Sequence, residues 1–284
     1  SPQQDLLEKF KTNGIKSIVL NLKKSPKTFI YSLNFIRKYV KNNNIDLIHV
    51  HMFHTLLITS LMRLLKGNFK VVFTLHNNLV FSRKRRILLM ILKCLHDVDT
   101  IFSKSALQYF HKKQHQVIPN GIDVSQYKKT INTIPNKTFS FIIVGRLEVM
   151  KNHSFLIDLA KQLDEFNFQI SIVGNGNLEQ SLKNQVSNLS LNSKIKFLGA
   201  RKDVPKLLEQ SDCLLLPSLW EGFPIVLLEA AASNIPIITT NVGSIPSFIN
   251  EDNGYITDLD GFQTAMIDVM NNYEHAKIKS EKLL

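Results

Sequence analysis

Short apolar runs that alternate with helix-length segments constrain the fold of this chain most. Several runs are apolar at nearly every position, as in Phe141–Val144 and Cys213–Leu216. Strands that are buried on both faces have this character, and they occur in parallel sheets covered by helices. The segments between the runs are mostly long enough for crossover helices. The pattern therefore predicts an α/β fold built from repeated β-α-β units.

The candidate strands are apolar runs bounded by polar or turn-forming residues. They are Ser17–Leu22, Asp46–Val50, Lys70–Leu75, Thr100–Ser103, Gln116–Pro119, Ser140–Gly145, Gln169–Val173, Lys194–Leu198, Cys213–Pro217, Pro236–Thr239 and Gly254–Thr257. A first helix is expected from Pro2, with Ser1 as its N-cap and Gly14 as its stop. Doubly wound domains ordinarily begin with a strand, and this sequence has no initiating Met. We therefore expect an N-terminally truncated sequence whose first strand is missing.

Charge divides the chain into two unlike halves. The 284 residues carry a formal net charge of +12, but residues 1–130 hold 22 Lys and Arg against 6 Asp and Glu, whereas residues 131–284 hold 13 against 17. The length is about twice that of a typical domain. The polar stretch Gly121–Lys137 contains Pro135 and separates the two halves, so it is the predicted linker. We expect an N-terminal domain over residues 1–125 and a C-terminal domain over residues 135–284.

The composition excludes several classes of protein. With 44% hydrophobic and 20% charged residues the chain has an ordinary globular balance, which argues against disorder. The apolar runs, such as Ile87–Leu92, are too short to span a bilayer as a helix. The two cysteines, Cys94 and Cys213, exclude a disulfide scaffold and suit a cytoplasmic protein.

Two glutamates separated by seven residues form the most informative motif, Glu221-Gly-Phe-Pro-Ile-Val-Leu-Leu-Glu229. It follows the run Cys213–Pro217 and enters a predicted helix, Ile225–Ser233. The carboxyl edge of a parallel sheet is where open α/β folds bind ligands. Backbone N–H groups at the start of a helix suit phosphate, and each carboxylate offers two acceptor oxygens to sugar hydroxyls. The spacing alone leaves open that both glutamates are ordinary charges near a helix start.

A second cluster follows the run that ends at Val144. Gly145 lets the backbone turn, and Arg146 and Lys151 bring two cations within six positions of it. A diphosphate leaving group needs positive charge as its bond to the sugar breaks. Arginine offers a fork for two phosphate oxygens and lysine offers a point charge. A solvated loop with two surface cations is the alternative that this stretch leaves open.

Together these stretches resemble retaining glycosyltransferases of family 4, and the resemblance covers nearly the whole chain. The matching motifs occur in the family's order: the interdomain signature Val117–Asp123, the phosphate-binding loop Ile143–Leu147 with Lys151 and Asn152, the strand ends Val173–Gly176 and Phe197–Gly199, and the paired glutamates Glu221 and Glu229. The resemblance implies the GT-B fold, in which two Rossmann-like domains face each other across a cleft.

The resemblance also implies how the C-terminal domain would hold a nucleotide-sugar donor. Glu221 would contact hydroxyls of the donor sugar and Glu229 those of the ribose, while Arg146 and Lys151 would neutralise the diphosphate. The other implied donor-binding positions are Gly145, Gly174, Gly176, Arg201, Gly222, Phe223, Pro224 and Ile225. Because proline has no N–H group, position 224 cannot donate a backbone hydrogen bond.

Histidines of the N-terminal half form a further candidate cluster. His76 follows the run Lys70–Leu75 and matches the family histidine that faces the donor sugar. The alternative is a histidine at a strand end whose hydrogen bonds are made within the fold. His49 and His51 alternate along a predicted strand and share a face, and His54 follows. Metal binding and contact with the acceptor both remain open for these three.

Two features depart from the family or mimic another one. Gly243–Ser247 has serine where the family often has glutamate, and the family's N-terminal glycine-rich loop is absent. Asp258 and Asp260 resemble a metal motif of a different glycosyltransferase fold, but turn and capping chemistry explain them.

The resemblance to family 4 implies no metal ion and no other cofactor. It also implies no base–nucleophile pair, because the departing phosphate assists in removing the acceptor's proton.

A basic cluster, Arg83–Arg86, precedes the apolar stretch Ile87–Leu92. A helix of this kind could lie on an anionic membrane surface, and a core helix with a solvated basic start is the alternative. No recognised nucleic-acid motif accompanies the charge, so we expect no nucleic-acid partner.

The leading hypothesis is therefore a hexosyltransferase of the retaining type. It would transfer a sugar from a nucleotide-diphosphate sugar, a UDP-sugar in our expectation, to a saccharide or lipid-linked acceptor in bacterial surface polysaccharide or glycolipid synthesis. We expect it in the cytoplasm or peripherally on the inner face of the plasma membrane. The alternatives are a nucleotide-sugar epimerase of the same fold and an inactive membrane-associated binding protein.

Overall fold

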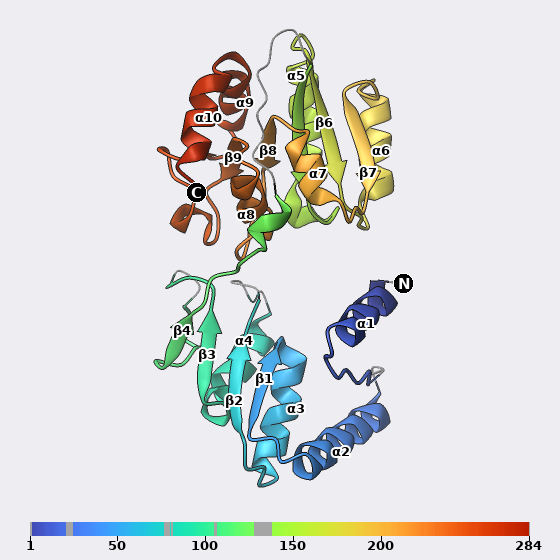
Figure 1. The fold of residues 1–284 in the computed structure, drawn as a ribbon, viewed down its shortest axis with the longest axis vertical. Helices are drawn as coiled ribbons and strands as arrows, with labels where there is room; N and C mark the ends of the chain where they lie inside the picture. The colour runs from blue at the N-terminus through green and yellow to red at the C-terminus, as the bar shows by residue number, and fades with distance from the viewer. Residues whose placement is uncertain are drawn as a thin grey trace.

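Two parallel sheets carry the predicted alternation of strands and helices (Figure 1). The computed structural model describes residues 2–20, 25–76, 80, 82–104, 107–127 and 138–283, with side chains from residue 7 onward. The N-terminal domain lies below the C-terminal domain in Figure 1, and the chain passes between them once. The predicted α/β class is therefore confirmed.

The N-terminal domain contains a four-stranded sheet in the order β1-β2-β3-β4, and every neighbouring pair is parallel. Its strands are β1 (Leu47–His51), β2 (Lys70–Thr74), β3 (Val98–Ile101) and β4 (His115–Val117), and its helices are α1 (Pro2–Thr12), α2 (Pro26–Asn42), α3 (Phe53–Leu64) and α4 (Arg83–Leu92). Val71 and Phe73 of β2 are buried with Leu56 of α3 and Leu89 of α4. Packing of these helices on the sheet forms the core of the domain.

The C-terminal domain contains a six-stranded parallel sheet in the order β10-β9-β8-β5-β6-β7. Its strands are β5 (Phe139–Val144), β6 (Phe168–Val173), β7 (Ile195–Gly199), β8 (Cys213–Leu216), β9 (Ile237–Thr240) and β10 (Tyr255–Thr257), and its helices are α5 (His153–Gln162), α6 (Glu179–Asn188), α7 (Val204–Glu209), α8 (Ile225–Ala232), α9 (Phe262–Asn271) and α10 (Tyr273–Glu281). The chain runs outward from β5 to β7, returns to β8, and runs outward to β10. This is the doubly wound order, and its switch point lies between β5 and β8.

Both faces of this sheet are buried, which explains why its central strands β5 and β8 are almost wholly apolar. In β5, Phe141 and Ile143 belong to a hydrophobic cluster that includes residues of α5, α6 and α9. Ile142, between them, belongs to a second cluster that includes residues of α7 and α8. Successive strand residues point to opposite faces, so a strand covered on both sides has few positions for polar side chains.

One predicted strand does not form in the part of it that the structure describes. Residues 17–20, which fall in the expected strand Ser17–Leu22, form no strand, and residues 21 and 22 lie outside the described residues. Ile18 and Val19 are 46% and 43% exposed. An apolar run needs a neighbouring strand to satisfy its backbone groups, and in the described part of the chain this run pairs with none. The other predicted strands are all present, although β3 begins two residues before the expected Thr100.

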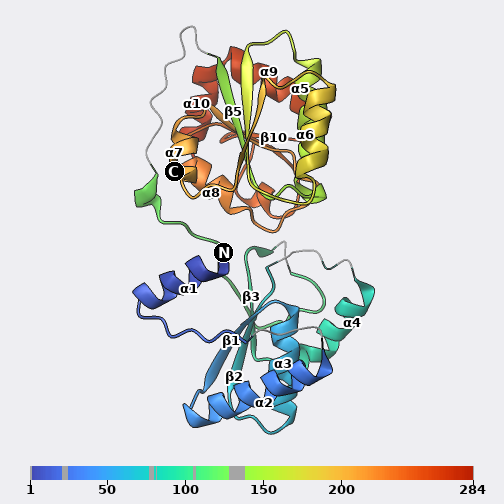
Figure 2. The same ribbon diagram turned by 90° about the vertical axis from the view of Figure 1, so that its right-hand side faces the viewer.

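The strands of each sheet run so that their carboxyl ends face the other domain. In Figure 1 the arrowheads of β1, β2 and β3 point up, and those of β6 and β7 point down; Figure 2 shows the same two layers turned by 90°. Of the predicted linker Gly121–Lys137, residues 128–137 lie outside the described residues. Tyr127 packs against the second hydrophobic cluster of the C-terminal domain.

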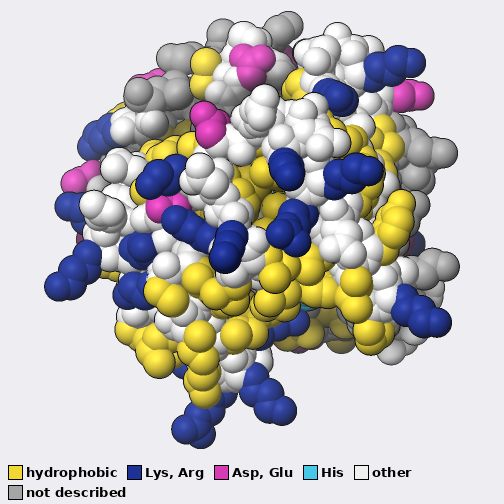
Figure 3. Space-filling view, turned by 90° about the horizontal axis from the view of Figure 1, so that it is seen from below, with side chains coloured by type: hydrophobic (Ala, Val, Ile, Leu, Met, Phe, Trp, Pro, Cys, Tyr) yellow, Lys and Arg dark blue, Asp and Glu magenta, His cyan; other side chains and the backbone are white. Residues whose placement is uncertain are grey.

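The two cysteines differ in burial, and one end of the molecule is rich in basic side chains. Cys213 is wholly buried in β8 and burial raises its pKa, whereas Cys94 is exposed next to α4. Lys and Arg side chains outnumber Asp and Glu on the end of the molecule that Figure 3 shows from below. Among the helices described here, none combines the length and apolar character needed to cross a bilayer.

A carboxylate at the start of β3 provides a test of this packing. Asp97 accepts two hydrogen bonds from Arg63, at 2.7 and 3.0 Å, and one from the N–H of Val71 at 2.8 Å. The hydrogen bonds from Arg63 lower the pKa of Asp97 from 3.8 to about 2. Because the pKa is lower in the folded state, the stabilisation is present above pH 3.8 and is lost as the pH falls toward 2.

We therefore expect Asp97→Asn to lower the free energy of unfolding by roughly 1–2 kcal/mol at neutral pH. The difference from the unsubstituted protein should shrink in urea denaturation at about pH 3. Asp46→Asn, which changes an exposed carboxylate of the same domain, is the control. A difference for Asp97→Asn that stays constant with pH would contradict the assignment.

Candidate functional site

A buried ion pair lies at the switch point between β5 and β8. Lys151 comes from the loop after β5 and Glu221 from the loop after β8, and Nζ of Lys151 is 2.6 Å from Oε1 of Glu221. Their side chains are 12% and 5% exposed. Carboxyl ends of neighbouring parallel strands meet at one edge of a sheet, which explains why two motifs separated by 70 positions come together.

Hydrogen bonds hold Glu221 from a second side. The buried hydroxyl of Ser218 donates to the same oxygen, Oε1, over 2.6 Å. Thr240, at the end of β9, donates in turn to the carbonyl oxygen of Ser218 over 2.6 Å. Two donors on one carboxylate oxygen fix the orientation of the group. Ser218 is not among the residues predicted from the sequence, although its place two residues beyond β8, at the carboxyl edge of the sheet, is a signal for it.

Glycines, which have no side chain, allow the loops of the site to approach each other. A Cβ atom on Gly174, whose φ is +142°, would lie 1.9 Å from the carbonyl oxygen of Gly145. A Cβ atom on Gly176 would lie 2.2 Å from the carbonyl oxygen of Leu147. The loops after β5 and β6 therefore touch through backbone atoms. The side chain of Lys151 lies across Gly145, because a Cβ atom there would be 3.1 Å from its Cε.

The loop that departs from the family pattern supports the paired-glutamate motif. Gly243 has a φ of +61°, and a Cβ atom on it would lie 2.1 Å from the carbonyl oxygen of Glu221. The N–H of Ser244 donates to the carbonyl oxygen of Gly222 over 3.2 Å, and its hydroxyl donates to the same oxygen. The loop is thus tied to the motif through Gly243 and Ser244, without the glutamate that the family often has.

The second glutamate meets the segment between the domains. Tyr127 donates from its hydroxyl to Oε1 of Glu229 over 2.9 Å. Burial raises the pKa of Glu229, and the hydrogen bond from Tyr127 opposes that rise. Asn120 donates from Nδ2 to the carbonyl oxygen of Phe223 over 3.1 Å. Neither contact is predicted from the sequence, because they join residues 102 and 103 positions apart.

The remaining residues of the motif form the entry to α8. Pro224 is buried and is the N-cap residue of the helix, and Ile225, the first helical residue, is 48% exposed. The ring of Phe223 meets that of Phe248 edge to face, with centroids 5.8 Å apart. The backbone N–H of Ile225 therefore lies at a helix start, whereas position 224 has none to offer.

Two predicted cations lie apart from the buried pair. The side chain of Arg146 is 70% exposed, and its guanidinium is 2.7 Å from Glu148. Arg201 is exposed and pairs with Asp203 over 2.6 Å. The structure therefore brings Lys151 and Glu221 together but pairs Arg146 and Arg201 with acidic neighbours two positions along the chain.

The histidines gather at the carboxyl ends of β1 and β2. Nδ1 of His51 is 2.9 Å from Nε2 of His76, and Nε2 of His49 is 2.8 Å from the hydroxyl of Thr74. The ring centroids of His49 and His51 are 4.2 Å apart, so the two residues share a face of the sheet as expected. Burial, and then the neighbouring imidazoles, lower the pKa of His49 and of His76. His54 is exposed on α3, against Phe53.

Asp258, one of the candidate metal positions, has a structural role in a turn. Asp258 accepts a hydrogen bond from the N–H of Gly261 over 2.9 Å, as a turn residue does. Within the described ranges, no group of three His, Cys, Asp or Glu side chains is arranged to hold a metal ion.

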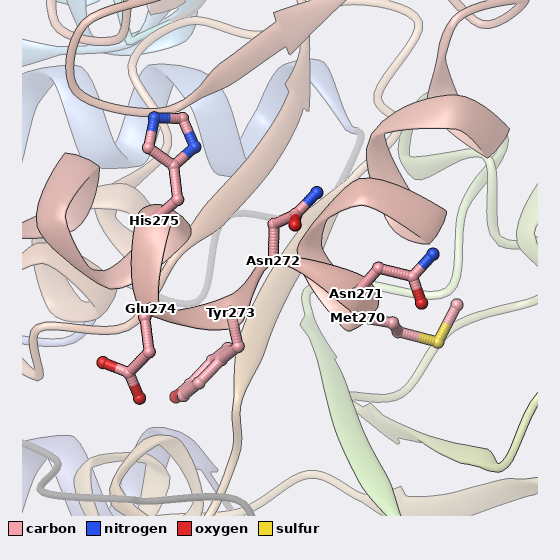
Figure 4. A pocket seen from close by; sticks show the side chains of 6 residues that line it. All are labelled: Met270, Asn271, Asn272, Tyr273, Glu274 and His275. Atoms are coloured by element: carbon pink, nitrogen blue, oxygen red, sulfur yellow. The ribbon is translucent and has the colours of Figure 1, made fainter.

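A surface pocket of about 420 Å³ lies where α9 meets α10 (Figure 4). Met270, Asn271, Asn272, Tyr273, Glu274 and His275 line it. None of them is a predicted site residue, and the pocket holds neither the buried ion pair nor a residue of the paired-glutamate motif. The switch point is therefore the better candidate for the functional site.

Comparison with known proteins identifies the family over both domains. The model of the family described as Glycosyl transferases group 1 matches residues 125–283, and that of Glycosyltransferase Family 4 matches residues 2–126. The UDP-Gal:alpha-D-GlcNAc-diphosphoundecaprenol alpha-1,3-galactosyltransferase of Escherichia coli is 30% identical over 85% of this chain and 70% of its own length. The N-acetyl-alpha-D-glucosaminyl L-malate synthase of Bacillus anthracis is 29% identical over 80% of this chain and 65% of its own length.

Solved structures show the same fold at low identity. The Anabaena protein HepE in complex with UDP and glucose has a TM-score of 0.79 at 20% identity, over 90% of this chain and 75% of its own. Sucrose-phosphate synthase from Thermosynechococcus elongatus has a TM-score of 0.80 at 18% identity, over 90% of this chain and 72% of its own. The chain therefore belongs to the group 1, family 4 glycosyltransferases and has their GT-B fold.

Proposed function

We propose that this protein is a retaining glycosyltransferase that takes a sugar from a UDP-sugar. The observation that carries the proposal is the buried Lys151–Glu221 pair at the switch point, beside the phosphate-binding turn at Gly145. Donor binding would draw Lys151 toward the diphosphate and leave Glu221 to accept hydrogen bonds from sugar hydroxyls. Names of relatives support the donor, because the Escherichia coli relative uses UDP-Gal.

The proposed reaction needs no protein nucleophile. The bond between the anomeric carbon and the phosphate oxygen breaks while the acceptor oxygen bonds to the same face of the sugar. Lys151 stabilises the negative charge that develops on the departing phosphate oxygen as the bond breaks, and that oxygen then takes the acceptor's proton. The amide at the start of α8 adds a partial positive charge on the same side.

The proposed acceptor is a saccharide or lipid-linked saccharide in bacterial surface polysaccharide or glycolipid synthesis. The Escherichia coli relative is named for a diphosphoundecaprenol-linked acceptor, and the Staphylococcus aureus relative CapH, 28% identical, for capsular polysaccharide biosynthesis. A lipid-linked acceptor would bring the protein to a membrane.

Helix α4 provides a surface suited to an anionic membrane. Arg83, Lys84 and Arg85 are exposed in its first turn. Ile87 and Ile91, four positions apart on one face, are 46% and 58% exposed. Exposed apolar side chains beside a basic first turn are the arrangement of helices that lie in the interface of anionic lipid. We propose that this helix touches the membrane from its cytoplasmic side.

The site assignment predicts a loss of transfer in two variants of the full-length protein. Glu221→Gln keeps the shape of the side chain but removes the charge, and we expect transfer to fall by about 100-fold or more while UDP still binds. Lys151→Ala should lose both transfer and UDP affinity, because the diphosphate loses its cation. Both are measured by transfer assays and calorimetry.

The ion pair on α6 provides matched controls for these variants. The side chains of Lys183 and Glu179 are 2.7 Å apart and exposed, so Glu179→Gln and Lys183→Ala make the same chemical changes outside the buried pair. They should leave transfer unchanged. Retention of activity in both Glu221→Gln and Lys151→Ala would refute the site assignment.

The mechanism predicts that the product keeps the anomeric configuration of the donor. We expect NMR of the product from the full-length protein to show the donor's anomer, with transfer unchanged by EDTA because no metal takes part. An inverted product, dependence on a divalent ion, or release of an epimerised free sugar would each contradict the mechanism.

The membrane proposal predicts that Ile87→Ser with Ile91→Ser weakens binding to anionic vesicles about 30-fold in sedimentation, because half-burying each isoleucine contributes roughly 1 kcal/mol. Ile278→Ser changes an equally exposed side chain on α10 and should have no effect. Equal binding by all variants, or binding to neutral vesicles alone, would argue against this surface.

A further inference from the structure

The segment between the domains touches both ends of the paired-glutamate motif. Asn120 reaches the carbonyl oxygen of Phe223, and Tyr127 reaches the carboxylate of Glu229, each through one hydrogen bond. In Figures 1 and 2 the green segment that contains these residues passes beside α8. A chain that only joined two domains would need neither contact.

Local structure directs Tyr127 toward the motif. Asp123 caps the short 3₁₀ helix η3 (Val124–Gln126): its carboxylate accepts from the N–H and the hydroxyl of Ser125 over 3.1 and 2.6 Å, and from Gln126 over 3.0 Å. Tyr127 follows directly. Its ring packs against the hydrophobic cluster that contains residues of α8, so ring and hydroxyl are both held by the C-terminal domain.

The hydrogen bond leaves Glu229 able to accept others. An ionised carboxylate has two oxygens and about four acceptor positions. The hydroxyl of Tyr127 takes one position on Oε1 and thereby fixes the rotation of the group. The other positions suit a pair of neighbouring hydroxyls, which is what a ribose presents.

We propose that Tyr127 is a positioning residue of the donor site, which orients Glu229 to receive the 2′- and 3′-hydroxyls of the nucleotide's ribose. The assignment rests on the proposed function, since it takes the ligand to be a nucleotide. It makes the segment between the domains part of the nucleotide site. The hydroxyl also favours the ionised carboxylate, because the hydrogen bond from Tyr127 opposes the rise that burial causes in the pKa of Glu229.

The test compares UDP with 2′,3′-dideoxy-UDP, which lacks both hydroxyls, by calorimetry on the full-length protein. Tyr127→Phe removes one oxygen and keeps the ring. We expect UDP to bind the variant about 3- to 10-fold more weakly, while affinity for the dideoxy compound stays the same. The acid limit of UDP binding should move to higher pH, because Glu229 loses the hydrogen bond that lowers its pKa.

A second tyrosine–carboxylate pair provides the control. Tyr255 donates to Asp268 over 2.8 Å in the same domain, between β10 and α9. Tyr255→Phe therefore makes the same change away from the site, and it should alter neither the discrimination between the two nucleotides nor the pH limit.

The outcomes separate this inference from the proposed function. Suppose that the unsubstituted protein binds UDP and that Tyr127→Phe has the same ratio of affinities for UDP and dideoxy-UDP as that protein. The positioning role is then wrong, and the donor site stands. Tighter binding of UDP by Tyr127→Phe would also overturn it, because the tyrosine would then compete with the ribose. If the unsubstituted protein binds no UDP, the proposed donor fails and this assignment fails with it.

Discussion

The burial of β5 and β8 on both faces is the constraint on which the site depends. Their alternate side chains fill two hydrophobic clusters, so the two strands must lie side by side in the middle of the sheet. Parallel pairing then brings their carboxyl ends to one edge. Lys151 and Glu221 can be a buried ion pair only because these strands deliver them there. A buried pair is stable only with close geometry and further hydrogen bonds, which Ser218 supplies.

The parts of the fold that could be predicted are those that local sequence encodes. Apolar runs bounded by turn residues located the strands of both sheets, and the signal was clearest in β5 and β8, which are buried on two faces. The same signal failed at Ser17–Leu22, where an apolar run remains exposed in its described part. Composition alone cannot tell whether a run has a partner strand.

The residues of the site likewise fall into those that local sequence predicts and those that it does not. Glu221, Glu229, Lys151 and the glycines lie in contiguous motifs with a spacing that indicates their chemistry. Tyr127 does not, because its contact with Glu229 spans 102 positions and no periodicity encodes it. Arg146 lies in a motif, yet its side chain points to Glu148 rather than to the buried pair. A motif fixes where a backbone turns more firmly than where a long side chain ends.

The contrast between the two cysteines has a practical consequence. Cys213 lies wholly inside β8 with a raised pKa, so its thiolate is both scarce and out of reach. Cys94 is exposed beside α4. A maleimide dye would therefore label the folded protein at a single position, on the domain that carries most of the basic charge. Native labelling of one thiol, against two after denaturation, would report directly whether the central sheet of the C-terminal domain is intact.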